Sequence, residues 1–177
     1  APLQNGDEAY PAMLPSIDGA STSIALCTYI FAADGAGRQF VAALARAVAR
    51  GVQVRVLVDD VGSRYTWPPV KRALVRAGVR VAHFLPIVSR RGIAFFNLRT
   101  HRKALIVDAR IAFAGGINIQ EANVWNGRPP QARRIRDVHF RICGPVVQQL
   151  LDTFAEDWAF VRGEVLDGPA WTTPVER

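Results

Sequence analysis

The sequence has little cysteine and no long hydrophobic run, and each scarcity narrows the classes of protein that it can encode. Two cysteines, Cys27 and Cys143, stand among its 177 residues. Both fall in apolar segments, so we interpret them as small buried side chains and not as a disulfide or a metal pair. The longest uncharged run, residues 19–33, is too short to span a bilayer and contains Ser, Thr and Tyr. We therefore expect no membrane span.

Acidic residues are missing between Asp60 and Asp108, a stretch that contains ten Arg and Lys residues. Residues 61–136 contain fifteen basic and two acidic residues, although the net charge of the whole chain is only +7. A charge distribution polarised in this way favours an anionic partner, such as phosphate, nucleic acid or an acidic membrane surface. The alternative is that arginine is simply the usual surface residue here, since Lys71 and Lys103 are the only lysines.

Length and composition favour one α/β domain. Half of the residues are apolar, which is enough for a sizeable core. Strand-like and helix-like segments alternate along the chain, so we predict a mixed β-sheet flanked by helices on both faces. We assign residues 1–163 to this domain and residues 164–177 to a peripheral C-terminal tail.

Hydrophobic periodicity predicts the positions of the individual elements. The predicted helices are 7–20, 37–50, 68–77 and 145–161, and the predicted strands are 23–31, 52–58, 79–84, 103–107, 111–114 and 138–143. Asp34 is placed to cap the helix that starts at residue 37, and Gly51 to end it. We expect a tight turn at 108–110, an irregular loop with a short strand at 85–97, and a basic loop at 127–136.

Residues suited to phosphate chemistry are concentrated between positions 101 and 118. His101 and Lys103 are two residues apart at a predicted strand start, so their side chains share a face and can reach one phosphate. Imidazole is a competent nucleophile toward phosphorus, and an ammonium group balances charge on the non-bridging oxygens. Gly115 and Gly116 leave room for backbone to approach a ligand, and Asn118 can donate a hydrogen bond.

Each of these residues also has a purely structural interpretation. A single histidine is usually an ordinary surface or core residue, Asp108 suits a turn, and a glycine pair at a strand end often forms a bulge. The combination is more informative, because average residue usage produces it in about one chain in ten thousand or fewer. Neither His83 nor His139 is followed by the same set of residues.

The pattern His101-x-Lys103-x4-Asp108-x6-Gly115-Gly116-x-Asn118 resembles the HKD signature of the phospholipase D superfamily. More of the chain resembles one branch, the bacterial cardiolipin synthases. The segments that carry this likeness are residues 5–10, 28–31 with Asp34, 50–59, 115–119, and 136–139 leading to 154–158. The resemblance covers nearly the whole chain and corresponds to the N-terminal lobe of a two-lobed enzyme, so it implies a phospholipase D-like fold.

The resemblance implies a phosphohistidine mechanism that needs no cofactor and no metal. His101 would be either the nucleophile or the acid that protonates the leaving alcohol, while Lys103 and Asn118 would hold phosphate oxygens. Asp137 is the candidate carboxylate for the far nitrogen of His101, with an ion pair to a neighbouring Arg as the alternative. Asp108 is expected to support the motif from a turn. Further candidates for phosphate or substrate binding are Gly115, Gly116, Arg99 and Arg102.

This chemistry uses two histidines, whereas the chain has one copy of the motif. We expect the second half-site to come from a missing C-terminal lobe or from a homodimer partner. The sequence starts at Ala1 without an initiator Met, which favours a fragment of a longer enzyme.

Three functional classes follow. The first is a phosphatidyltransferase acting on an anionic, phosphatidylglycerol-like phospholipid, with residues 93–96 either an apolar rim for acyl chains or a buried strand. The second is a homodimeric phosphodiesterase acting on nucleic acid, less favoured because Tyr65 and Trp67 are among few aromatics in the basic region. The third is a noncatalytic lipid-binding domain, which the intact motif disfavours. The resemblance implies a bacterial protein, cytoplasmic or peripheral at the inner membrane.

Overall fold

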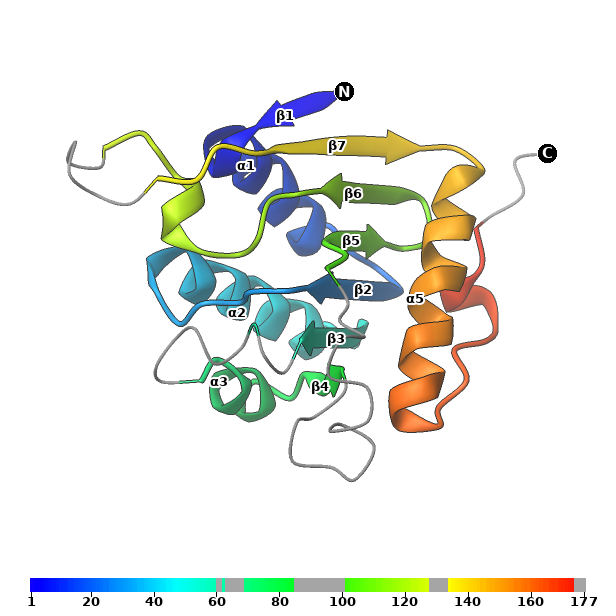
Figure 1. The fold of residues 1–177 in the computed structure, drawn as a ribbon. Coiled ribbons are helices and arrows are strands. Elements are labelled where there is room, and N and C mark those ends of the chain that lie inside the picture. The colour runs from blue at the N-terminus through cyan, green and yellow to red at the C-terminus, as the bar shows by residue number, and fades with distance from the viewer. Residues whose placement is uncertain (60–61, 63–68, 85–100, 128–133, 174–177) are drawn as a thin grey trace, which may run out of the picture.

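The strands of the described residues form one mixed sheet. The computed structural model describes residues 1–59, 62, 69–84, 101–127 and 134–173. The seven strands of this part of the chain have the spatial order β1-β7-β6-β5-β2-β3-β4 (Figure 1). Their bounds are Pro2–Gln4 (β1), Ser23–Thr28 (β2), Gln53–Asp59 (β3), Arg80–Phe84 (β4), Ala104–Val107 (β5), Ile111–Gly115 (β6) and Val138–Cys143 (β7).

Helices cover both faces of the sheet, as predicted. They are α1 (Asn5–Asp18), α2 (Gly35–Ala49), α3 (Lys71–Arg76) and α5 (Val146–Arg162), with short 3-10 turns η2 (Glu121–Asn123) and η3 (Pro169–Trp171). One core cluster joins the sheet to α1, α2 and α3, and a second joins it to α5 and η3. In Figure 1, α1 and α2 lie behind the strands, whereas α5 runs across the strand direction on the right.

The central strand β2 explains why the sheet needs cover on both sides. All six of its residues are buried. Ile24 and Leu26 face the α1–α2 cluster, while Ala25 and Cys27 face the α5 cluster. Successive side chains of a strand point to opposite faces, so a continuous apolar run is stable only when both faces are covered.

Strand directions bring several chain segments to one edge of the sheet. β2, β3 and β4 are parallel, whereas β5 runs antiparallel to β2, β6 to β5, and β7 to β6. The ends of β2 and β6 therefore lie beside the starts of β5 and β7. We call this the motif edge, because His101 and Lys103 precede β5 there and Gly115 ends β6.

Capping and turn residues set the ends of the helices and strands largely where the sequence predicts. The Asp34 side chain accepts a hydrogen bond from the N–H of Gly37 at 3.0 Å and so caps α2. Asp108 and Ala109 adopt positive φ in the tight turn between β5 and β6, which confirms that turn. The strand β1 was not predicted, because it has only three residues and lies at the edge of the sheet, where it pairs with β7 alone.

The two cysteines differ in burial. Cys27 is buried on β2, as expected, and burial raises the pKa of its thiol to about 11. The expectation that Cys143 is buried is wrong, because that residue is exposed. Cys143 is the last residue of β7, and β1 pairs only with residues 138–140, so the end of β7 extends past its neighbour.

The C-terminal segment is not peripheral over residues 164–173, contrary to prediction. Trp171 is buried within the α5 cluster, and the Ser23 hydroxyl donates a hydrogen bond to the carbonyl of Ala170. The Arg55 guanidinium on β3 lies 5.7 Å from the centre of the Trp171 ring and pairs with Glu164 at 2.6 Å. An arginine inside the sheet must be paired, and this segment supplies its partners. Residues 174–177 lie outside the described part of the chain.

Truncating the Trp171 side chain tests whether the C-terminal segment belongs to the core. We expect Trp171→Ala to lower the free energy of unfolding by about 3 kcal/mol, because it opens a cavity beside α5 and uncovers Arg55. Urea denaturation followed by circular dichroism measures this. Val165→Ala is the matched control, since Val165 is 73% exposed. A loss below about 1 kcal/mol for Trp171→Ala would make the segment peripheral after all.

Candidate active site

His101 and Lys103 lie together at the motif edge, beside the residue that follows β2. The imidazole of His101 is exposed and packs against the ring of Tyr29, with 4.3 Å between ring centroids. The Lys103 ammonium lies 5.6 Å from the centre of the same ring. It also donates a hydrogen bond to the His101 carbonyl at 2.6 Å. The predicted pair therefore forms one compact group with Tyr29.

The ammonium of Lys103 lies in a partly desolvated place. Burial lowers the pKa of Lys103 below its ordinary value, and the nearby Asp137 carboxylate acts in the opposite direction. A positive charge that is partly removed from water interacts more strongly with an incoming anion. Lys103 is thus placed to stabilise charge on a phosphate at His101.

Asn118 presents its amide to the same edge. Its Oδ1 accepts a hydrogen bond from the N–H of Ile30 at 3.0 Å, and its backbone carbonyl accepts one from the Tyr10 hydroxyl at 2.6 Å. These contacts fix the amide so that its oxygen points into the protein. The Nδ2 group donates to no other residue in the described part of the chain, so its two N–H donors remain for a ligand.

Gly115 and Gly116 allow close packing at the motif edge. Their N–H groups donate to the carbonyls of Lys103 and Val138, at 3.2 and 3.0 Å. A Cβ on Gly115 would lie 2.2 Å from the Val138 carbonyl oxygen, and one on Gly116 would lie 2.0 Å from an Asp137 carboxylate oxygen. β7 and the Asp137 side chain occupy the space beside the two glycines, and the assignment of Gly115 and Gly116 to phosphate binding stays a prediction.

Asp137 lies at the motif edge, but in the described residues its carboxylate makes no hydrogen bond with His101. Its Oδ1 accepts one from the N–H of Val138 at 2.8 Å. The role of Asp137 as partner of His101 therefore remains a prediction. The neighbouring His139 is structural: its Nδ1 accepts a hydrogen bond from the N–H of Ile117, and burial lowers its pKa to about 4.

Asp108 lies at the opposite end of β5 from His101 and Lys103, so the structure does not bring it to the site. Its carboxylate accepts hydrogen bonds from the N–H groups of residues 21–23 at 2.8 to 3.1 Å and from the Thr22 hydroxyl at 2.9 Å. Burial alone would raise the pKa of Asp108, but these donors together hold it below its ordinary value. Asp108 thus ties the turn after β5 to the start of β2.

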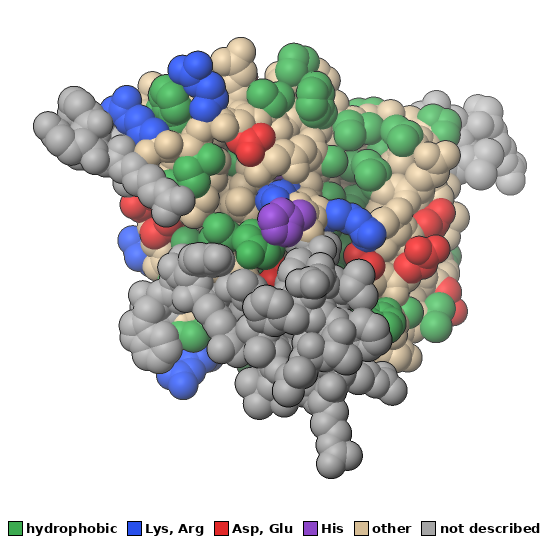
Figure 2. Space-filling view, viewed as in Figure 1, with side chains coloured by type: hydrophobic (Ala, Val, Ile, Leu, Met, Phe, Trp, Pro, Cys, Tyr) green, Lys and Arg blue, Asp and Glu red, His purple; other side chains and the backbone are tan. Residues whose placement is uncertain are grey.

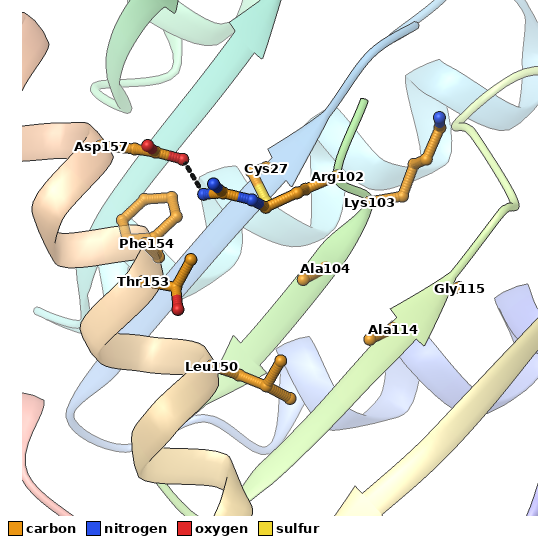
Figure 3. A pocket seen from close by; sticks show the side chains of 10 residues that line it. All are labelled: Cys27, Arg102, Lys103, Ala104, Ala114, Gly115, Leu150, Thr153, Phe154 and Asp157. Atoms are coloured by element: carbon orange, nitrogen blue, oxygen red, sulfur yellow. Dashed lines mark hydrogen bonds and ion pairs between the residues drawn. The ribbon is translucent and has the colours of Figure 1, made fainter. Parts of the chain in front are cut away.

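Arg102 is engaged by α5 in this structure, and its assignment as a phosphate-binding residue stays a prediction. Its guanidinium forms an ion pair with Asp157 on α5. Figure 3 shows Arg102 extending toward Asp157, whereas Lys103 points away from the cavity. This cavity, of about 220 Å³, is lined mainly by small and apolar residues of β5, β6 and α5, and Gly115 is among them. Arg99, Tyr65, Trp67 and residues 93–96 lie outside the described residues.

Sequence reasoning missed two residues that contact the motif. Tyr29 lies in a segment that carried the family resemblance, but nothing in its neighbours indicated contact with His101. Asp157 lies in another such segment, and its ion pair with Arg102 spans 55 positions. Both contacts depend on the packing of distant elements, which hydrophobic periodicity does not specify.

The family of the chain follows from comparison with known proteins. A family model described as "Cardiolipin synthase, PLD-like domain" matches residues 13–158. The chain belongs to this family. The resemblance to the phospholipase D superfamily predicted from the motif is thereby confirmed.

Curated relatives agree with this assignment. The probable cardiolipin synthase YwiE of Bacillus subtilis is 33% identical over 178 residues, which cover 98% of this chain. The cardiolipin synthase of Oceanobacillus iheyensis is 37% identical over 155 residues, covering 87% of this chain. These alignments cover 34% and 32% of the two relatives. The phospholipase D-like chain thus spans about a third of their length.

Solved structures support the fold. The phospholipase D family member Nuc from Salmonella typhimurium superposes with a TM-score of 0.68 at 21% identity, covering 92% of this chain and 96% of Nuc. NucT from Helicobacter pylori gives a TM-score of 0.64 at 16% identity, covering 84% of this chain and 86% of NucT. At these identities the likeness shows the fold alone, and it confirms the predicted phospholipase D-like α/β architecture.

The described residues of this phospholipase D-like domain contain neither a membrane-spanning helix nor a cluster of metal ligands. Among those residues, no helix is both long enough and apolar enough to cross a membrane. No three His, Cys, Asp or Glu side chains of the described part come together in a way that would hold a metal ion.

Replacing the carboxylate of Asp108 tests its structural role. We expect Asp108→Asn to lower the free energy of unfolding by about 2 kcal/mol at neutral pH, because an amide nitrogen would face N–H donors. Folding lowers the pKa of Asp108, so its stabilisation is complete above the ordinary value of 3.8 and is lost as the pH falls through the folded value. The difference from wild type should therefore shrink below about pH 4.

Urea denaturation over a pH series measures this difference. Asp167→Asn is the control, because Asp167 is exposed. A difference that stays constant down to about pH 2 would show that the charge of Asp108 does not stabilise the fold.

Proposed function

We propose that this chain supplies one half-site of a phospholipase D-type phosphatidyltransferase of the cardiolipin synthase kind. The observation that carries the proposal is the grouping of His101, Lys103 and the Asn118 amide at one edge of the sheet. A nucleophile, a cation and a neutral donor at one point are what transfer at a phosphate diester requires. Membership in the family supports the same conclusion.

The reaction runs in two displacements at phosphorus. A nitrogen of His101 attacks the phosphorus of a phospholipid diester, and the bond from phosphorus to the head-group alcohol breaks. The departing oxygen takes a proton from a histidine of the second half-site. The hydroxyl of an acceptor lipid then attacks phosphorus, gives up its proton to that second histidine, and breaks the bond to His101. Lys103 and Asn118 hold the non-bridging oxygens throughout.

The second histidine must come from another lobe, either elsewhere in a longer chain or in a second copy. The present chain contains one copy of the motif and spans about a third of its curated relatives. A partner lobe must approach the motif edge closely if its histidine is to reach the same phosphorus atom. The surface next to that edge is therefore where we place it.

An exposed apolar strip begins at the motif edge with Val138 and runs along β7 to the start of α5, which follows the opposite end of that strand. Val138 and Phe140 on β7 are 37% and 50% exposed, and Val146 at the start of α5 is 43% exposed. We call these three residues the β7–α5 strip. In Figure 2, hydrophobic side chains gather over the side of the molecule where Figure 1 shows β7 and the start of α5, above the histidine and the basic side chains beside it. Apolar side chains in one exposed patch are typical of a surface that a partner covers.

The substrate we propose is an anionic phospholipid such as phosphatidylglycerol, met at the inner face of a bacterial membrane. The excess of basic residues between positions 61 and 136 supports attraction to an anionic lipid surface. Peripheral association suits a lobe whose substrate remains in the bilayer.

A phosphodiesterase acting on nucleic acid is the second candidate. The observation that favours it is the similar size of Nuc, 96% of which superposes on this chain. A second copy of this chain would then complete the site. The same basic residues suit the backbone of DNA.

Replacing His101 tests the reaction. In an enzyme that contains this lobe and its second half-site, His101→Ala should lower the rate of cardiolipin formation from phosphatidylglycerol vesicles by about 10⁴-fold or more, because no phosphohistidine can form. A parallel assay on DNA separates the two candidates. Turnover of DNA but not of lipid would favour the phosphodiesterase. Turnover of neither substrate would indicate a noncatalytic domain.

The two lysines provide a matched control for this experiment. Lys103→Met should lower the rate strongly, whereas Lys71→Met, on the exposed surface of α3, should leave it within about twofold of wild type. Undiminished activity of His101→Ala in a homogeneous preparation would remove the role that we assign to His101.

A charge in the β7–α5 strip tests where the second lobe lies. We expect Phe140→Asp to weaken association with that lobe at least about tenfold, because a carboxylate would be buried against apolar side chains. Sedimentation velocity measures self-association of this chain, and a pull-down measures binding of a separately expressed second lobe. Phe160→Asp is the control, since Phe160 is 63% exposed and lies near the other end of α5. If Phe140→Asp and Phe160→Asp weakened association equally, the interface would lie elsewhere.

A further inference from the structure

The aromatic ring of Tyr29 is the one described side chain that contacts both His101 and Lys103 through ring interactions. The Tyr29 and His101 rings are 4.3 Å apart between centroids and inclined by 39°. The Lys103 ammonium lies 5.6 Å from the centre of the Tyr29 ring, within the range of a cation–π contact. The ammonium also donates to the His101 carbonyl. The three residues therefore hold one another in a closed group.

The backbone around Tyr29 is held on both sides. Thr28 is the last residue of β2, and the N–H of Ile30 donates to Oδ1 of Asn118 at 3.0 Å. A Cβ on Gly62 would lie 1.8 Å from the Tyr29 carbonyl oxygen, so only glycine allows the chain to pass this close. The segment that places the Tyr29 ring thus also orients the Asn118 amide.

We propose that Tyr29 is a positioning residue for both His101 and Lys103, its ring face setting the orientation of the imidazole and holding the ammonium beside it. The inference rests on the proposed function, because it assigns Tyr29 a part in the same phosphate site. The electron-rich face of a phenol ring attracts a cation, and its flat surface restricts rotation of a ring stacked on it. A nucleophile held in one orientation loses less entropy on reaching phosphorus.

Several groups lie near the Lys103 ammonium in the described residues. They are the Tyr29 ring, His101, the Cys27 thiol of β2, the Asp137 carboxylate just before β7 and the buried His139 of β7. Asp137 favours the charged form of Lys103, and Cys27 acts in the same direction, whereas burial disfavours it. The Tyr29 ring face adds a further attraction to the charged form. Its removal should therefore lower the pKa of Lys103 further.

The first test needs no turnover. In this chain, nuclear magnetic resonance of the lysine side chains follows two residues only, Lys71 and Lys103. Tyr29→Leu should lower the pKa of Lys103 by about 0.5, and Tyr29→Phe, which keeps a ring face, should change it by less than about 0.2. The titration of Lys71 serves as the internal control in each variant. An unchanged or raised pKa of Lys103 in Tyr29→Leu would overturn the proposal.

The second test uses the assembled enzyme. Tyr29→Leu should lower kcat about tenfold with KM within about twofold of wild type, because an ill-oriented histidine slows chemistry more than binding. Tyr29→Phe should restore kcat to within about twofold, since it keeps the ring. Equal loss of kcat in both variants would assign the effect to the hydroxyl and overturn the role of the ring.

The two tests separate this inference from the proposed function. If neither lipid nor DNA is turned over but the Lys103 titration responds as expected, the function fails and the contact stands. If the wild-type enzyme is active and both Tyr29 variants match it, the function stands and the positioning role fails. Urea denaturation of each variant establishes that the fold is retained.

Discussion

The antiparallel pairing of β5 with β2 is the constraint on which the site depends. β2, β3 and β4 run in one direction, and β5 enters the sheet beside β2 in the other. Only this reversal places His101 and Lys103 next to the residues that follow β2. Asp108 fixes the register from the far end of β5 by accepting hydrogen bonds from Ser23, the first residue of β2, and from the two residues before it. A slip of one residue would turn His101 and Lys103 to the opposite face of the sheet.

The side chains of the three residues just before β5 point in alternating directions. His101 and Lys103 meet the Tyr29 ring, whereas Arg102 between them points toward Asp157 on α5. The arginine therefore connects the start of β5 to a helix, and the two flanking residues remain for chemistry. Gly115 and Gly116 also serve packing, because the absence of their side chains allows β7 and Asp137 to approach the motif edge. Several positions of the motif are therefore explained by packing and need no contact with a phosphate.

The parts of the fold that follow from short-range physics could be predicted from the sequence. Apolar alternation located β2, β3 and β5, and the cap Asp34 located the start of α2. The positions of His101, Lys103 and Asn118 at one edge followed from the family motif. The partner of Arg102, the burial of Trp171 and the contact of Tyr29 with His101 could not be predicted, because each depends on elements distant in sequence. Cys143 was misassigned because its segment is largely apolar, but that end of β7 extends past β1 and is exposed.

A second lobe at the exposed motif edge would change how strongly Lys103 attracts a phosphate. Lys103 is already partly desolvated, and a lobe seated on the β7–α5 strip would remove more water from the motif edge. Attraction between the ammonium and a phosphate grows as water is excluded, so closure would strengthen binding of the anion where the second histidine arrives. The apolar residues of the strip would provide the energy of association, since charged residues at the edge gain little before they are paired. Docking of the second lobe and formation of the complete site would in this way be one event.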